Sequence, residues 1–351
     1  MDGSVERTRA VINGRKPDRA PMFDLLRNDA VLSHFSGEKL ELENAKRVVY
    51  KAFAPAIDST RPNVRVPHKE ESLELPDGRK QERFRWTTWT EHVQYRDAEH
   101  YAKAKQEILA SFDPAWNDEY QSQLDAFMQK FREMKAMLGE LFFVASGWIP
   151  GFMSITGEIG LEQFSYFLAD CPAVIDAQLD INTERAVQFI SHLPADHGIE
   201  AVFVGDDIAF HSGPFLSPAW FSEHYFPLLT RITDAYHRRG IKVLFHSDGN
   251  LNPVMDGLVA AGIDGLNPIE ILAGMDIADL HRRYPDLFMA GGIDVSQLLP
   301  FGTAQQVKDA VYKAIDDAEG RLMVGSTTEL NNEVPLENFL AMREAVLETS
   351  Y

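Results

Sequence analysis

The chain has 351 residues, more than the roughly 250 of a typical single α/β barrel and too few for two generous domains with a linker. With 45% hydrophobic and 25% charged residues, the composition excludes disordered and collagen-like proteins. A formal net charge of −19 disfavours nucleic acid and anionic membrane surfaces as partners.

The N-terminal segment begins MDGSVERTRAVINGRKPDRAP and lacks the apolar core of a signal peptide. No stretch of the chain reaches the 18 or more uncharged apolar residues of a membrane span. We therefore expect a cytoplasmic protein with an N-terminal extension. The extension leads to two candidate strands, APMFDL at 20–25 and FAPAIDS at 53–59.

Residues 62–96 differ from their surroundings. The segment predicts a β-hairpin that turns at Pro76-Asp77-Gly78-Arg79, followed by an aromatic strand. We interpret it as an insertion that caps a barrel. Residues 99–138 are rich in charged and helix-forming residues and predict helices of an outer layer.

From residue 141 onward, short apolar runs alternate with longer helical segments, which indicates repeated βα units. The helical segment 217–240 has a Ser-Pro start and a terminal Gly. Together with the two earlier candidates, the runs supply eight strands, so we predict a single (β/α)8 TIM-barrel domain over residues 1–351. The six candidate strands of this part are LFFVAS at 141–146, AVFVG at 201–205, KVLFH at 242–246, GLN at 265–267, LFMAGG at 287–292 and RLMVGS at 321–326.

Functional residues of such a barrel follow the ends of its strands, and five successive strand ends here carry acids. Asp206 and Asp207 follow one strand; Asp206 can take a capping role and leave Asp207 free for catalysis. Glu270 is either a second catalytic acid or part of the first turn of the next helix. For Asp294 we expect helix capping.

The spacing His246-x-Asp248 carries the sharpest prediction. Both side chains lie on one face if the strand continues, because side chains alternate along a strand. A histidine and a carboxylate can bind zinc or another divalent ion, or act as an acid/base pair. Glu329 or Thr328, after the last strand, would complete a site with His246 and Asp248.

Several further residues are candidates for substrate binding. Trp148 and Phe210 lie near strand ends, where aromatic rings would line a pocket for an apolar or cationic molecule; packing is the alternative. Arg27 and Asn267 complete this predicted substrate-binding set.

The pattern resembles the uroporphyrinogen decarboxylase superfamily, which also contains corrinoid-dependent methyltransferases. The resemblance implies the barrel, covers nearly the whole chain, and makes a homodimer an expectation. It rests on the opening RTRAVINGRKPDRAPM and on five later segments: GDDIAFHSGPFLSPAWFSEHYFPLLTRI, HRRGIKVLFHSDGN, GIDGLNPIE, GGIDVSQLLPFGTAQQVKDAV and VPLENFLAM.

The chain departs from the decarboxylases of that superfamily at both of their anion-binding segments. Their Arg-Gln-Ala-Gly-Arg stretch corresponds here to residues 24–29, DLLRND, and their C-terminal Gly-His-Gly to residues 327–329, TTE. The methyltransferases bind zinc through His-x-Cys and a later Cys, which correspond here to His246-x-Asp248 and Thr328 beside Glu329. The histidine is kept and both thiols are absent, a set that suits an oxygen-bound methyl group better than a thiol.

The resemblance therefore implies methyl transfer from a small methylated compound, such as an O-methyl aromatic, to a separate corrinoid protein. Zinc would be held by His246, Asp248 and Glu329, with Asp207 or Glu270 acting on the leaving group. The chain has no Asp-x-His-x-x-Gly corrinoid segment, so cobalamin would arrive on the partner. Two alternatives stay open: a cofactor-free decarboxylase of a smaller acid, with Arg27 and Arg61 lining its pocket, and a binding protein without catalytic activity.

Overall fold

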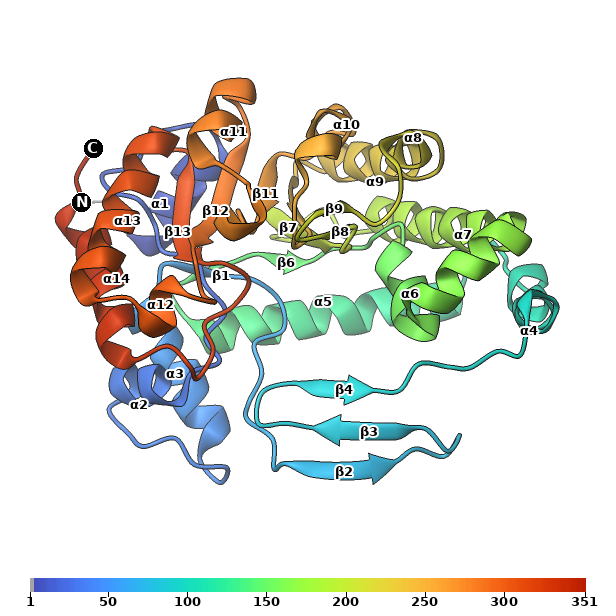
Figure 1. Ribbon diagram of the computed structural model, residues 1–351, viewed down its shortest axis with the longest axis horizontal. Coiled ribbons are helices and arrows are strands. Elements are labelled where there is room, and N and C mark those ends of the chain that lie inside the picture. Colours follow the sequence, from blue (N-terminus) through green and yellow to red (C-terminus); the bar gives the residue numbers. More distant parts are fainter. Residues whose placement is uncertain (1–2) are drawn as a thin grey trace.

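The computed structural model describes residues 3–351 and shows a barrel of parallel strands surrounded by helices (Figure 1). Six of its strands form one parallel sheet in the order β13-β12-β11-β10-β7-β6. Another parallel pair joins β1 to β5, and β5 and β6 are successive parts of the segment 142–146. The barrel strands are β1 (Ser59–Thr60), β5 (Phe142–Phe143), β6 (Ala145–Ser146), β7 (Ala201–Gly205), β10 (Lys242–His246), β11 (Gly265–Asn267), β12 (Phe288–Ile293) and β13 (Leu322–Ser326).

Residues 22 and 23 close the ring. Met22 pairs in parallel with Val324 of β13, and Phe23 pairs in parallel with Ser59 of β1. The segment 20–25 is thus the first barrel strand, and eight strand positions follow one another around the circle. The predicted (β/α)8 barrel is confirmed.

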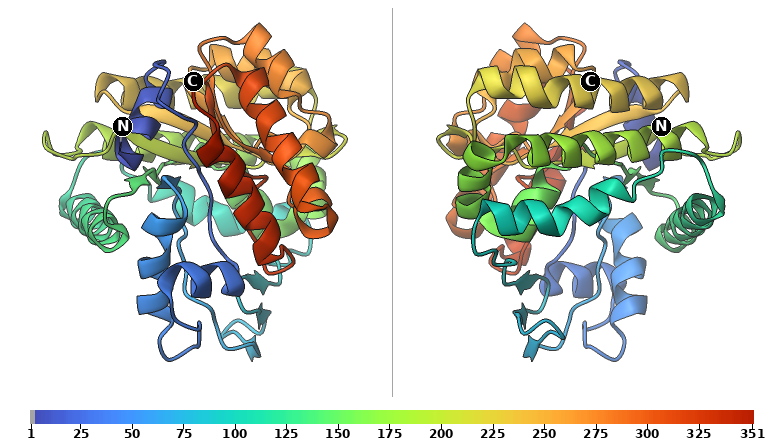
Figure 2. Two further views of the ribbon diagram at one scale, coloured as in Figure 1. Left: turned by 90° about the vertical axis from the view of Figure 1, so that its left-hand side faces the viewer. Right: turned by 90° about the vertical axis from the view of Figure 1, so that its right-hand side faces the viewer.

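The helices form the outer layer (Figure 2). The N-terminal extension contributes α1, which packs with Val11 and Ile12 against the side chains inside the barrel, including Phe142, Phe203 and Phe288. The helices are α1 (Ser4–Ile12), α2 (Asp29–Ser36), α3 (Ala45–Ala56), α4 (Ala98–Ala110), α5 (Asp118–Leu138), α6 (Phe152–Asp170), α7 (Pro172–Ser191), α8 (Pro218–Trp220), α9 (Phe226–Arg238), α10 (Met255–Ala260), α11 (Ile277–Arg283), α12 (Leu298–Phe301), α13 (Ala304–Ala318) and α14 (Leu336–Glu348), with the short turns η1 (Phe221–Tyr225), η2 (Asn252–Val254) and η3 (Ile271–Ala273).

Most of the predicted elements are found where the sequence placed them. The segment 217–240 forms α8, η1 and α9; Ser217 caps it by accepting from the Trp220 N–H, and Gly240 ends it at φ 72°. Helices α4 and α5 occupy the predicted helical region. Within residues 3–351, no helix is both long and apolar enough to cross a membrane.

The second predicted strand is wrong over most of its length. Residues 53–56 are the last turn of α3, and the strand is only Ser59–Thr60. The buried residues Val48, Val49, Ala52, Phe53 and Ala56 recur at the three- and four-residue spacing of a helix, and this period decides the structure.

The insertion forms an antiparallel sheet of β2 (Glu71–Glu74), β3 (Lys80–Arg83) and β4 (Thr88–Thr90), with the predicted turn between β2 and β3. A smaller hairpin, β8 (Ala209–Phe210) and β9 (Gly213–Pro214), follows β7. Arg85 and Trp86 both donate to the carboxylate of Asp29, at the start of α2. Figure 1 shows the three-stranded sheet set apart from the barrel strands.

At the amino-terminal end of β11, Asp264 ties three neighbouring groups together. It binds His237 at 2.8 Å, Lys242 at 2.8 Å and the Val243 N–H at 2.8 Å. The hydrogen bond with Asp264 raises the pKa of His237 above its usual 6.5, and the surrounding donors hold the pKa of Asp264 below its usual range although burial opposes them. Asp264 therefore has a structural role.

We expect the substitution His237→Gln to lower the free energy of unfolding more at about pH 6 than at about pH 9. A histidine with a raised folded-state pKa contributes stability that is fully present below its unfolded pKa of 6.5 and is lost as the pH rises through the folded value. The half-exposed ring limits the difference to less than about 1 kcal/mol. Urea unfolding of both proteins at the two pH values measures it; a difference independent of pH would contradict this assignment.

Candidate functional site

His246 is the last residue of β10, and its ring nitrogens have different environments. In the sheet, His246 lies opposite Gly205 of β7 and Asn267 of β11. Its Nδ1 lies 2.9 Å from the Asn267 Oδ1, while the Asn267 Nδ2 donates to the Ala290 carbonyl at 3.0 Å. The Asn267 oxygen must therefore accept the hydrogen bond from His246, so the Nδ1 of His246 carries the proton. In the neutral ring, Nε2 keeps its lone pair.

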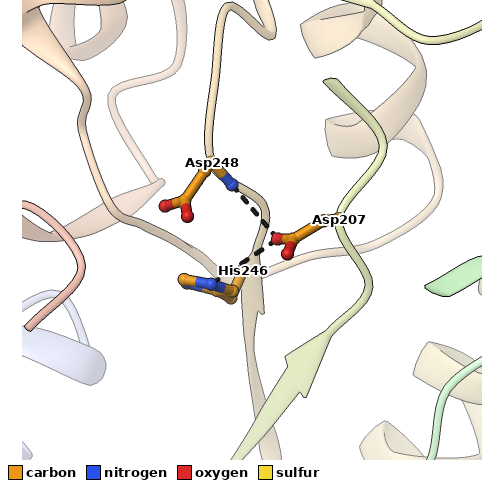
Figure 3. Close-up of side chains that lie close together, drawn as sticks. All are labelled: Asp207, His246 and Asp248. Atoms are coloured by element: carbon orange, nitrogen blue, oxygen red, sulfur yellow. Dashed lines mark hydrogen bonds and ion pairs between the residues drawn. The ribbon is translucent and has the colours of Figure 1, made fainter. Parts of the chain in front are cut away.

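Asp207 and Asp248 approach this free nitrogen from two strand ends (Figure 3). The Asp207 Oδ1 lies 3.6 Å from the His246 Nε2 and accepts from the Asp248 N–H at 3.3 Å. One potential ligand atom from each of the three side chains lies within 4.8 Å of the others. We call this group, Asp207, His246 and Asp248, the mouth triad.

The turn that carries Asp248 is held by its local sequence. The Ser247 hydroxyl accepts from the Ile208 N–H at 3.0 Å and donates to the Asp248 carbonyl at 2.9 Å. Gly249 has φ 92°, and a Cβ there would lie 2.4 Å from the Phe210 carbonyl oxygen. Glycine is therefore required where the turn passes β8.

Thr328 fixes the Asp248 carboxylate from across the barrel. Its hydroxyl donates to the Asp248 Oδ1 at 2.7 Å, and its carbonyl accepts from Arg61 at 2.9 Å. Thr328 has φ 75°, a left-handed conformation that β-branched residues rarely adopt. This strained backbone lies directly beside the mouth triad, as is common at functional sites.

Burial sets the charge states of the mouth triad. Burial of His246, together with the positive charge of Arg61, lowers the pKa of the imidazole below 6.5. Burial raises the pKa of the Asp207 carboxyl, and the neighbouring His246 offsets part of this rise. At neutral pH the histidine is neutral, as a metal ligand or general base must be.

Arg27, Arg61 and Glu329 form a charged group next to the mouth triad. Arg27 donates to Glu329, whose other oxygen lies 3.5 Å from an Nη of Arg61. The Arg61 guanidinium also lies 4.8 Å from the centre of the Phe203 ring, which itself packs on His246. Both arginines are buried, and the Nε of each has no hydrogen-bond partner among the described residues.

Comparison with known proteins identifies the family of the chain. The sequence profile described as uroporphyrinogen decarboxylase (URO-D) matches residues 143–349, more than half of the chain. The chain belongs to the uroporphyrinogen decarboxylase family. The match covers the third to the eighth barrel strands and all three members of the mouth triad.

Two proteins that are similar to this chain, one in sequence and one in fold, carry the name of methyltransferase. The methylcobamide:CoM methyltransferase MtbA of Methanosarcina mazei is 23% identical over 154 residues, 44% of this chain and 42% of that protein, so the chain spans less than half of the length of this relative. The solved structure of a methyltransferase from Methanosarcina mazei superposes with a TM-score of 0.66 at 16% identity, over 99% of both chains. This likeness shows the fold.

The structure brings two of the three predicted metal ligands together and places the third apart from them. His246 and Asp248 come together as expected, but the third side chain of the group is Asp207, not Glu329. Glu329 faces two arginines, whose charges attract it more strongly than a neutral imidazole can. Glu270 lies beside the turn and accepts from the Gly249 N–H at 2.6 Å.

The predicted substrate-binding residues have four different environments. Asn267 is buried and orients His246, Arg27 binds Glu329, and Phe210 is half exposed at the edge of Phe215. Trp148 packs between Phe127 and Phe189 in the outer layer. These contacts show that Trp148 packs in the outer layer, which was the alternative to its lining a substrate pocket.

Two capping predictions are confirmed. The Asp206 carboxylate accepts from the backbone N–H groups of residues 151, 152 and 153 at the start of α6, which leaves Asp207 free. Asp294 accepts from residues 296, 297 and 298 around the start of α12. What the sequence did not reveal is the orienting role of Asn267; its place at the end of the strand beside His246 is the one signal for it.

Proposed function

We propose that this chain is a methyltransferase that moves a methyl group from a small O-methylated compound, such as a methoxylated aromatic, to a corrinoid on a separate protein, with the help of zinc. The mouth triad carries the proposal. It combines a neutral histidine with two carboxylates at the carboxyl end of the barrel strands, where barrel enzymes have their active sites. The methyltransferase names of the sequence relative and of the structure with the same fold support this branch of the family.

The donor set of the mouth triad fits a divalent ion. His246 presents an unprotonated Nε2, and its other nitrogen is held by Asn267, the arrangement typical of metal-binding histidines. Asp207 and Asp248 add oxygen ligands. A bound zinc ion would supply Lewis acidity toward the oxygen that loses its methyl group.

The residues around the mouth triad have proposed roles in handling the leaving group. When the carbon–oxygen bond breaks, the bonding electrons stay on oxygen, which then needs a proton. Glu270 is the half-buried acid beside the Asp248 turn and is the proposed source of that proton. Thr328 and Asn267 act as positioning residues, because they hold Asp248 and His246 without belonging to the triad.

A transfer assay tests this function. The zinc-loaded full-length chain is mixed with free cob(I)alamin and a series of methoxylated benzoates and phenols, and methylcobalamin is followed by its absorbance. We expect formation that depends on both enzyme and O-methyl donor. Transfer from thiol-methyl or amine-methyl compounds alone would contradict the proposed donor class.

The buried arginines support a second candidate, decarboxylation of a small carboxylic acid without a cofactor. Within residues 3–351, Arg27 and Arg61 each keep one unpaired Nε donor, and a substrate carboxylate would satisfy such groups. Asp207 and His246 would then handle protons. Release of carbon dioxide from small acids by the metal-free chain, with no methyl transfer by the zinc-loaded chain, would favour this candidate.

A further inference from the structure

A cavity lies on the outer side of the barrel, between the strand segment 142–146 and α5. It has a volume of about 450 Å³, within the range of small-molecule sites. Phe142 and Val144 point into the barrel, whereas Phe143 packs in the outer layer with its ring 5.9 Å from that of Phe131 on α5. Phe143 and Phe131 line the cavity on the outer side of the barrel wall, and no member of the mouth triad lines it.

The walls combine flat apolar surfaces with positive charge. Phe127, Phe131 and Phe143 line the cavity together with Met134. Two cations also line the cavity, Arg65 on the segment after β1 and Lys130 on α5. Among the described residues that line the cavity, none is acidic.

Neither Arg65 nor Lys130 forms an ion pair within residues 3–351, although the protein carries 19 excess negative charges. By contrast, Arg27 at the barrel mouth is paired with Glu329. Two unpaired cations beside the same aromatic cavity create a local region of positive potential, which favours the binding of an anion.

We propose that this cavity is a second binding site, for a flat aromatic compound that carries a carboxylate. The aromatic walls would cover the ring system, and Arg65 with Lys130 would bind the carboxylate. The site is separate from the mouth triad, so the proposal does not depend on methyl transfer or on a bound metal.

Calorimetric titration of the full-length chain with naphthalene-2-carboxylate tests the proposal, with naphthalene-2-methanol as the uncharged probe. We expect the carboxylate to bind at least about tenfold more tightly than the alcohol, because charge-assisted hydrogen bonds are lost with the alcohol. The double variant Arg65→Met/Lys130→Met should weaken carboxylate binding by about tenfold or more. The single variants Arg65→Met and Lys130→Met provide the same test if the double variant does not fold.

Two control variants determine whether the carboxylate binds in this cavity or elsewhere on the protein. Arg132→Met removes a cation from the same helix at a position that does not line the cavity, and binding should remain unchanged. His246→Ala alters the mouth triad and should also leave binding unchanged. Equal weakening by Arg132→Met, loss of binding in His246→Ala, or no binding by the unmodified chain would each overturn the proposal.

Discussion

Replacing His246 with alanine is expected to remove the bound metal, from about one zinc per chain to almost none. His246 is the sole nitrogen donor of the mouth triad, and its Nε2 faces both carboxylates. Methyl transfer should fall by about a thousandfold or more, equivalent to about 4 kcal/mol of lost transition-state stabilisation. Elemental analysis of untagged, zinc-reconstituted protein measures the first effect, and the cob(I)alamin assay the second.

His211→Ala is the matched control for this experiment. His211 follows β8 on the same side of the barrel, is exposed and lies outside the mouth triad. It should keep both the metal and the activity. Circular dichroism would establish that both variants fold. A His246→Ala protein that retains zinc, or a wild-type chain that binds none after reconstitution, would contradict the proposed metal centre.

The substitution Glu329→Gln is expected to destabilise the fold by about 3 kcal/mol while leaving the metal content unchanged. Removing the carboxylate leaves Arg27 and Arg61 buried side by side without their anion. Burial already lowers the pKa of both arginines, a sign that their charged forms are costly in this environment. Urea unfolding measures the loss of stability, and elemental analysis measures the metal.

This variant distinguishes two roles for Glu329. If Glu329 were a metal ligand, as its position after the last strand predicts, Glu329→Gln would lose zinc. Glu333→Gln makes the same change on the same loop, at an exposed side chain that forms no ion pair with any described residue, and should alter neither quantity. Loss of zinc at wild-type stability would restore the ligand role.

The mouth triad illustrates how far sequence reasoning extends. His246 and Asp248 could be paired from their spacing, because side chains two apart share one face of a strand. The roles of Asp206 and Asp207 could be distinguished because a capping carboxylate stabilises the start of a helix, which left the neighbouring acid for the site. Both arguments use neighbours along the chain. The third member of the triad required the register between β7 and β10, which local patterns do not specify.

The sequence by itself determined the barrel, since the alternation of short apolar runs and amphipathic helices leaves few other ways to bury them. It also determined where most strands end, the insertion, and the helix-capping roles of Asp206 and Asp294. Only the tertiary structure decided that Glu329 meets Arg27 and Arg61, residues about 300 and 270 positions away, and that Asn267 orients His246. The physical reason is that closing the barrel brings distant strand ends together, so the local electric field, rather than position in the chain, selects the partner of each carboxylate.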